Sequence, residues 1–206
     1  MRTRLFTLFV FVMTGLSLFA QKQTYEKMWK SVEAFEKKDL PQSVIKKTNE
    51  IYQKAFAEKN SPQMFKAFLY NANTKLKIDA DSFYVNLKGL EKWEAESTVP
   101  MDKAILNSMI AELYADYAQS NSWQLRNGKQ LTGETPEDIR EWSTNLFIQK
   151  AFSCLRNSLK DQKLLQETAS SAYEPIVSNG ETSGYFHHAK LQMSGCVASG
   201  LLLACK

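Results

Sequence analysis

The stretch WKSVEAFEKKDLPQSVIKKTNEIYQKAFAEKNSPQMFKAFLY, residues 29–70, contains two helix starts of the same kind, and they decide the fold. Pro41 and Pro62 each stand where an apolar stripe with helical spacing begins again. Proline is favoured at the first position of a helix because its missing N–H would have no partner there. The stretch therefore predicts a helix that ends near Lys38, a second helix from Pro41, and a third helix from Pro62.

Similar start signals occur on both sides of this stretch. Thr24, Ser82 and Pro100 also precede apolar residues at helical spacing, so every second start lies about 40 residues further along the chain. This rhythm predicts five helices between residues 24 and 118, stacked as antiparallel pairs. The last of the five should lie inside the stack, because its apolar residues cover a wide arc: Ile105, Leu106, Met109, Ile110, Leu113, Tyr114 and Tyr117.

Beyond residue 118 the pattern is less regular. Residues 119–134 are polar and predict a loop, and helical signal resumes at Pro136. There the first apolar residues give way to a second set, Ile148, Phe152, Leu155 and Leu159. We therefore expect a helix whose apolar face drifts or which bends, followed by a last helix over residues 161–173. No segment alternates with a period of two. The predicted fold is all-α, an antiparallel helix-hairpin array of TPR-like or solenoid-like type with about seven helices.

The two ends of the chain differ from its middle. Residues 1–20 have the order of a signal peptide, with Arg2 and Arg4 before an apolar run and a small residue, Ala20, at the expected cleavage site. The alternative is a retained membrane anchor, which the short and interrupted apolar run disfavours. We expect export to the periplasm or cell envelope, with no membrane span after cleavage. The expected organisation is a signal peptide (1–20), a helical-repeat domain (21–178) and a flexible or aberrant tail (179–206).

The tail has an unusual composition. No aspartate or glutamate follows Glu181, and both histidines and two of the three cysteines lie after Thr182. Such a break is typical of a linker, of a disordered tail, or of coding in the wrong frame at the end of a shortened gene. We expect the fold not to depend on residues 182–206.

The candidate metal ligands are confined to this tail. His187 and His188 are adjacent, whereas Cys196 and Cys205 are widely spaced, unlike the close pairs of a zinc site. A Ser-His-Asp or Cys-His site needs a histidine on a rigid element, which the tail does not predict. The third cysteine, Cys154, lies on an apolar helix face and is expected to be a small core residue.

Other candidate residues favour structural roles. Two groups of carboxylates share a helix side but are flanked by lysines, so we expect solvated surfaces; they are Glu33 and Glu36, and Glu91, Glu94 and Glu96. Trp29, Trp93 and Trp142 occupy stripe positions and are expected in the core, while Trp123, in the loop, could be a contact residue. Residues 21–88 contain no glycine, hence no glycine-rich phosphate loop.

These observations predict a protein without catalytic, cofactor-binding or metal-binding residues. The formal net charge of the chain is +4, and it falls to +2 when Arg2 and Arg4 leave with the signal peptide. This balance does not favour a nucleic-acid partner. Helical arrays usually present a surface to another protein, so a protein partner of unknown identity is expected.

Residues 29–70 also resemble the N-terminal region of the large alpha-2-macroglobulin-like proteins exported by Bacteroidetes. The resemblance consists of Ala20-Gln21 at the signal cleavage site, the KKDLP turn at residues 37–41, the Ile51-Tyr52 helix with Lys54-Ala55, and the restart at residues 60–67. Residues 138–165, DIREWSTNLFIQKAFSCLRNSLKDQKLL, are similar to the helical region of that family as well.

The resemblance implies a non-catalytic helical scaffold or interaction module, the N-terminal fragment of such a protein. The family's β-sandwich domains, bait segment and C-x-E-Q thioester are expected further along a longer chain. Neither Cys154, followed by LRN, nor Cys196, followed by VAS, fits that thioester motif. The alternative is a free-standing exported TPR-like module that binds another protein.

The signal-peptide pattern gives a direct prediction. The mature protein should begin at Gln21, because Ala20 completes the order of charged, apolar and small residues that signal peptidase recognises. N-terminal sequencing of the protein isolated from the cell envelope measures this. An intact Met1 on the abundant species would contradict both cleavage and export.

Overall fold

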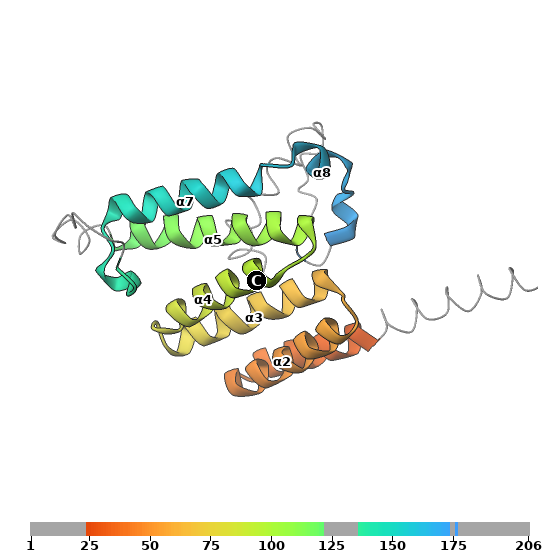
Figure 1. Cartoon of the computed structure of the whole chain (residues 1–206). Coiled ribbons are helices and arrows are strands. Elements are labelled where there is room, and N and C mark those ends of the chain that lie inside the picture. Colours follow the sequence, from red (N-terminus) through yellow and green to blue (C-terminus); the bar gives the residue numbers. More distant parts are fainter. Residues whose placement is uncertain (1–23, 122–135, 174–175, 177–206) are drawn as a thin grey trace, which may run out of the picture. The chain divides into compact units, whose positions relative to one another are not determined.

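The computed structural model describes residues 24–121, 136–173 and 176 (Figure 1). In these ranges the chain forms helices, turns and short connections, and no strand occurs. The all-α prediction is therefore confirmed. The described residues fall into two compact units that divide between Ile78 and Asp79.

The first unit contains a helix over residues 24–36, α2 (Pro41–Ala57) and α3 (Ser61–Ile78). All three begin within a residue of the predicted starts. The turns that follow the first helix and α2 each contain a residue with positive φ, Asp39 at 52° and Lys59 at 54°. The next N–H in each turn closes back on the helix, Leu40 on the Phe35 carbonyl (3.0 Å) and Asn60 on the Ala55 carbonyl (2.8 Å). This left-handed closure ends each helix and lets the next one run back beside it.

Buried polar contacts join the helices of the first unit. Asn71 of α3 donates from Nδ2 to the Ile45 carbonyl (3.1 Å) and to Thr48 Oγ1 (3.0 Å) of α2. Tyr25 donates its hydroxyl to Glu58 Oε2 at 2.6 Å, which ties the start of the first helix to the end of α2. The apolar core around them consists of Tyr25, Trp29, Val32, Val44, Ile51, Ala55, Met64, Phe65, Ala67 and Ala72.

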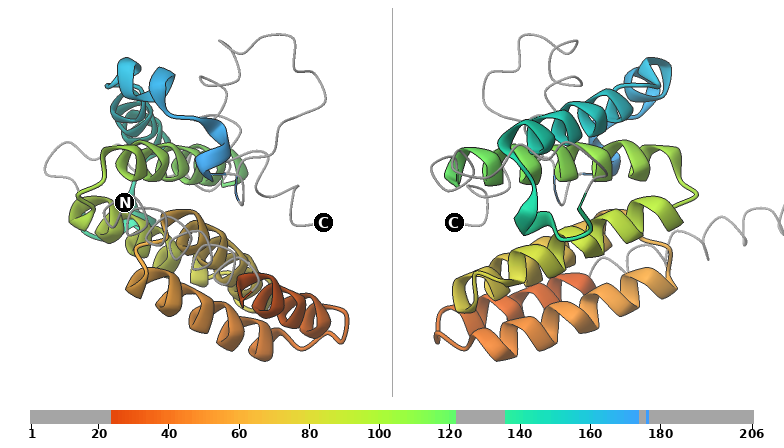
Figure 2. Two further views of the ribbon diagram at one scale, coloured as in Figure 1. Left: turned by 90° about the vertical axis from the view of Figure 1, so that its right-hand side faces the viewer. Right: turned by 60° about the vertical axis from the view of Figure 1, so that its left-hand side comes forward.

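The second unit is built around one long helix, α5 (Pro100–Ser120). α4 (Ser82–Glu96), α7 (Thr144–Ser158) and α8 (Gln162–Glu167) all pack against it. Figures 1 and 2 show α5 and α7 running side by side, in opposite directions. Among the described helices α5 holds the most buried residues, as its wide apolar arc predicts.

The second unit differs from the prediction between residues 136 and 173. Instead of one bent helix, the chain forms a short 3-10 helix, η1 (Ile139–Glu141), an extended step at Trp142 and Ser143, and then α7. Ser143 Oγ accepts the Leu146 N–H at 3.3 Å and so caps a new helix start. The expected last helix is likewise divided, because Thr168 is extended between α8 and a second 3-10 helix, η2 (Ser170–Tyr173).

Some expectations concern residues outside the described ranges. The proposed signal peptide (1–20), residues 122–134 of the expected loop, which include Trp123, and the expected tail (179–206) all lie there. The expected loop begins later than predicted, because α5 continues to Ser120. Within the described part of the chain, no helix is both long and apolar enough to cross a membrane.

The burial of α5 yields a stability prediction. Leu106 is fully buried, whereas Leu113, on the same apolar arc, is only half-buried. Leu106→Ala should lower the free energy of unfolding by about 2–5 kcal/mol, because it removes core methylenes and leaves a cavity. The matched control Val85→Ala, at a position 66% exposed on α4, should change it by less than about 0.5 kcal/mol. Urea denaturation followed by circular dichroism measures the free energy of unfolding of both variants. An equal loss of stability in the two would show that Leu106 does not lie in the core.

Candidate interaction surface

The expected carboxylate groups divide into two kinds. Glu33 and Glu36 are exposed, as predicted. Glu91 and Glu96 are exposed as well, and Glu94 is half-buried. Glu91 and Glu94 nevertheless reach from α4 to polar side chains of α5. Glu91 accepts the Tyr114 hydroxyl, and Glu94 Oε1 accepts Asn107 Nδ2 at 2.9 Å. Buried donors on α5 need acceptors, and these two carboxylates supply them.

Cys154 is half-buried on α7. Burial raises the pKa of its thiol, and the negative charges of Glu91 and Glu94 raise it further. A thiol in such surroundings is a poor nucleophile, because little of it is ionised. The other two cysteines and both histidines, at positions 187, 188, 196 and 205, lie outside the described residues. Within the described part no cluster of three or more His, Cys, Asp or Glu could hold a metal ion.

Of the three tryptophans expected in the core, one is buried and two are half-buried. Trp29 is buried in the first unit; its ring centroid is 5.0 Å from that of Tyr70, and its Nε1 donates to Gln63 Oε1 at 2.8 Å. Trp93 and Trp142 are half-buried. Trp142 lies in the extended step before α7, where it stacks on Tyr114 with 5.6 Å between ring centroids.

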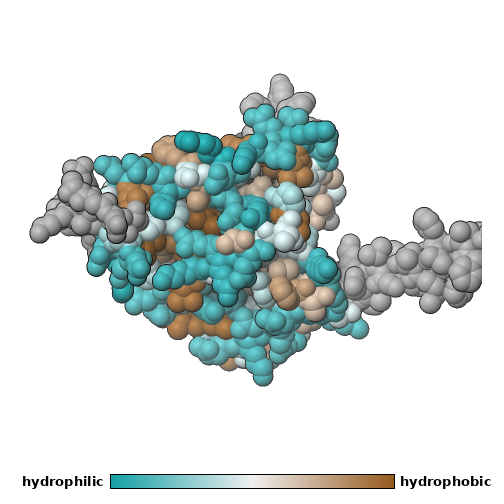
Figure 3. Space-filling view, viewed as in Figure 1, coloured by the Kyte–Doolittle hydropathy of each residue, from teal (hydrophilic) through white to brown (hydrophobic). Residues whose placement is uncertain are grey.

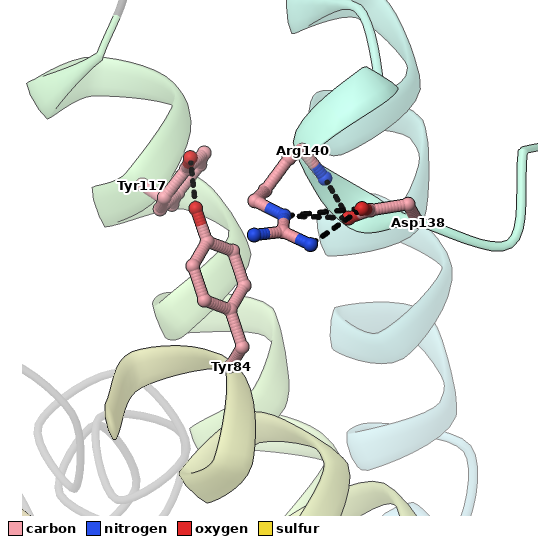
Figure 4. Close-up of polar contacts among 4 residues, drawn as sticks. All are labelled: Tyr84, Tyr117, Asp138 and Arg140. Carbon is pink, nitrogen blue, oxygen red and sulfur yellow. Dashed lines mark hydrogen bonds and ion pairs between the residues drawn. The ribbon is translucent and has the colours of Figure 1, made fainter. Parts of the chain in front are cut away.

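A group of polar residues fixes the segment that leads into α7 (Figure 4). The hydroxyls of Tyr84, on α4, and Tyr117, on α5, are 2.9 Å apart. Arg140 of η1 lies with its guanidinium carbon 5.5 Å from the centroid of the Tyr84 ring. Its Nε and Nη2 donate to Asp138, at 3.0 and 2.7 Å. The cluster thus joins η1 to α4 through Tyr84, whose hydroxyl in turn joins α4 to α5.

The protonation states of this cluster agree with a structural role. Its hydrogen bonds with Arg140 lower the pKa of the Asp138 carboxyl to about 2, so the pair stays ionised at neutral pH. Burial and the bond with Tyr84 raise the pKa of Tyr117 to about 12, so that phenol stays protonated. Neither Asp138 nor Tyr117 therefore changes its protonation state near neutral pH.

The inner face of α7 is held by aromatic packing. Phe147 is fully buried and lies 4.8 Å from Tyr117, 5.4 Å from Trp142 and 6.1 Å from Tyr114, measured between ring centroids. These contacts, together with the Ser143 cap, fix the rotation of α7 about its own axis. They therefore determine which of its side chains face outward.

The outward side chains include an apolar stripe. Ile148, Phe152 and Leu155 are 40%, 61% and 36% exposed, and their i, i+4, i+7 spacing places them on one side of α7. We call these three residues the outer stripe. Figure 3 shows hydrophobic residues at the surface, set among hydrophilic ones, on the face that it views.

The outer stripe is the second apolar set that the sequence shows in α7. The sequence analysis interpreted this set as a drift of the apolar face or a bend of one helix. In the structure a new helix starts at the Ser143 cap, Phe147 is turned inward, and these three side chains stay exposed. Exposed apolar side chains at i, i+4 and i+7 are typical of a helix that binds another helix. No protein family, curated protein or solved structure matches the chain in comparison.

The surroundings of Cys154 give a reactivity prediction. With Cys196→Ser and Cys205→Ser to remove the other thiols, Cys154 should react with a thiol reagent at least about tenfold more slowly in the native protein than in urea. Its raised pKa and partial burial reduce the accessible thiolate until the helices separate. The rate of thiol modification, followed by absorbance, measures this. Equal rates in the two states would place Cys154 in open solvent.

Proposed function

We propose that this chain is a non-catalytic helical interaction module, the N-terminal helical region of an exported alpha-2-macroglobulin-like protein. The observation that supports a binding role most directly is the outer stripe of α7. It presents three exposed apolar side chains on a helix whose other side is fixed by Phe147. A rigid helix with an exposed apolar stripe is suited to holding a partner.

The polar groups of the described residues support the same proposal. Glu91, Glu94 and Asp102 accept hydrogen bonds from Tyr114, Asn107 and Tyr173, respectively. Each of these bonds joins two elements of the second unit and leaves the carboxylate engaged in structure. A scaffold uses its polar groups in this way, whereas a hydrolase needs a carboxylate, thiol or histidine that is directed at a substrate.

A free-standing exported module that binds another protein is the alternative. It uses the same outer stripe and differs only in what the gene encodes after residue 206. The signal-peptide pattern of residues 1–20 is compatible with both versions.

The DNA that follows this reading frame distinguishes the two. We expect macroglobulin-type coding sequence in another frame, because residues 29–70 and 138–165 resemble that family whereas the composition changes abruptly after Glu181. An unrelated gene after an ordinary stop codon would contradict the macroglobulin proposal and favour the free-standing module. Sequencing the locus from the source strain, followed by translation in all frames, is the measurement.

A further inference from the structure

The charged side chains of α7 itself are all basic. α7 contains Lys150 and Arg156 and no aspartate or glutamate, and Lys160 follows its end. Lys150 lies over the ring of Trp142, with Nζ 5.6 Å from the ring centroid. Arg156 is exposed and stands four residues after Phe152, which places it beside the stripe. Among the described residues, no carboxylate forms an ion pair with Arg156 or Lys160.

The extent of the stripe suits one further helix. Its three side chains span two helical turns, about 10 Å along the axis. Phe152, the central residue, is the most exposed of the three, so it would supply most of the apolar contact. A helix that crosses α7 here would place its own apolar residues against Phe152 and its flanks next to Arg156.

We propose that the outer stripe binds an acidic amphipathic helix of a partner protein. The partner's apolar residues would pack on Ile148, Phe152 and Leu155, and its carboxylates would pair with Arg156 and Lys160. This inference rests on the proposed function, an interaction module, and specifies the chemistry of the partner. Complementary charge of this kind selects among partners and increases the rate of association.

Three other occupants fit less well. A second copy would bring the cations of one α7 against those of another, without a carboxylate on either helix. Residues 182–206 contain no aspartate or glutamate and cannot complement Arg156. An anionic membrane would also attract the cations, but a stripe of three side chains offers little of the apolar area on which membrane binding depends.

The test uses the full mature chain and two labelled helical peptides. Both peptides carry leucine at i, i+4 and i+7, and they differ only in having glutamate or lysine at the flanking positions. Fluorescence anisotropy measures binding of each. The glutamate peptide should bind, and the lysine peptide should bind at least about tenfold more weakly, because it meets Arg156 and Lys160 with like charge.

Two pairs of variants locate the binding site. Phe152→Ser should weaken binding of the glutamate peptide about tenfold or more, while Phe56→Ser, at a position 62% exposed on α2, should leave it unchanged. Arg156→Glu should weaken binding of the glutamate peptide and strengthen binding of the lysine peptide. Lys27→Glu, which reverses an exposed charge on the helix over residues 24–36, should affect neither. Thermal melting followed by circular dichroism verifies that all four variants fold.

Several outcomes would overturn the inference. Equal binding of the two peptides, or no effect of Phe152→Ser, would exclude charge-selected docking on the stripe. Failure of both peptides to bind the folded chain would do the same. Binding to phosphatidylglycerol vesicles that Phe152→Ser abolishes, without peptide binding, would identify a membrane as the occupant. Dimerisation in sedimentation that Phe152→Ser abolishes would identify a second copy.

The inference and the proposed function can fail separately. An unrelated gene downstream would contradict the macroglobulin origin without changing the peptide result. A folded chain that binds neither peptide would contradict the acidic-helix partner without changing the interpretation of the locus.

Discussion

The packing of Phe147 against Tyr114 and Tyr117 is the contact on which the second unit depends. It places the one fully buried aromatic side chain of α7 against the most buried described helix. Because α7 has two apolar sides, its rotation is not determined by hydrophobicity alone. Aromatic packing on one side, reinforced by the Ser143 cap, resolves the ambiguity and leaves the outer stripe exposed.

Hydrogen bonds between buried or half-buried side chains then fix how neighbouring helices align. Asn71 binds backbone and side-chain groups of α2, and Tyr173 of η2 donates to Asp102 in the first turn of α5 at 2.7 Å. Each such bond is directional, whereas apolar contacts tolerate sliding. A helix displaced by one turn would leave these polar groups buried without partners, at a cost of about 1–3 kcal/mol for each group.

Much of the fold could be predicted from the sequence, because its helix starts are marked by particular residues. Pro41 and Pro100 open α2 and α5, and Ser61-Pro62 opens α3. Local chemistry of this kind does not depend on the rest of the molecule. The division between η1 and α7 could not be predicted, since Ile139 and Phe147 have spacings that a continuous helix would also give. Only the extended backbone at Trp142 and Ser143 separates the two elements.

The candidate surface was harder to predict for a related reason. The spacing of Ile148, Phe152 and Leu155 indicates a helix side but does not say whether another helix covers it. Similarly, the lysines around Glu91 and Glu94 suggested solvent, although their partners Tyr114 and Asn107 lie on a different helix. Whether a pattern is buried or exposed is a property of the packed structure rather than of the segment.

The left-handed residues Asp39 and Lys59 have a consequence for how the first unit folds. Holding a residue with a Cβ in this left-handed conformation costs about 1–2 kcal/mol of folding free energy. Glycine would avoid that cost, but residues 21–88 contain none. In proteins most helical stability also comes from packing of the apolar face rather than from the helix by itself. Neither hairpin should therefore close as an isolated peptide. The turns and the three-helix core around Ile51 and Phe65 should form together, in a single cooperative step.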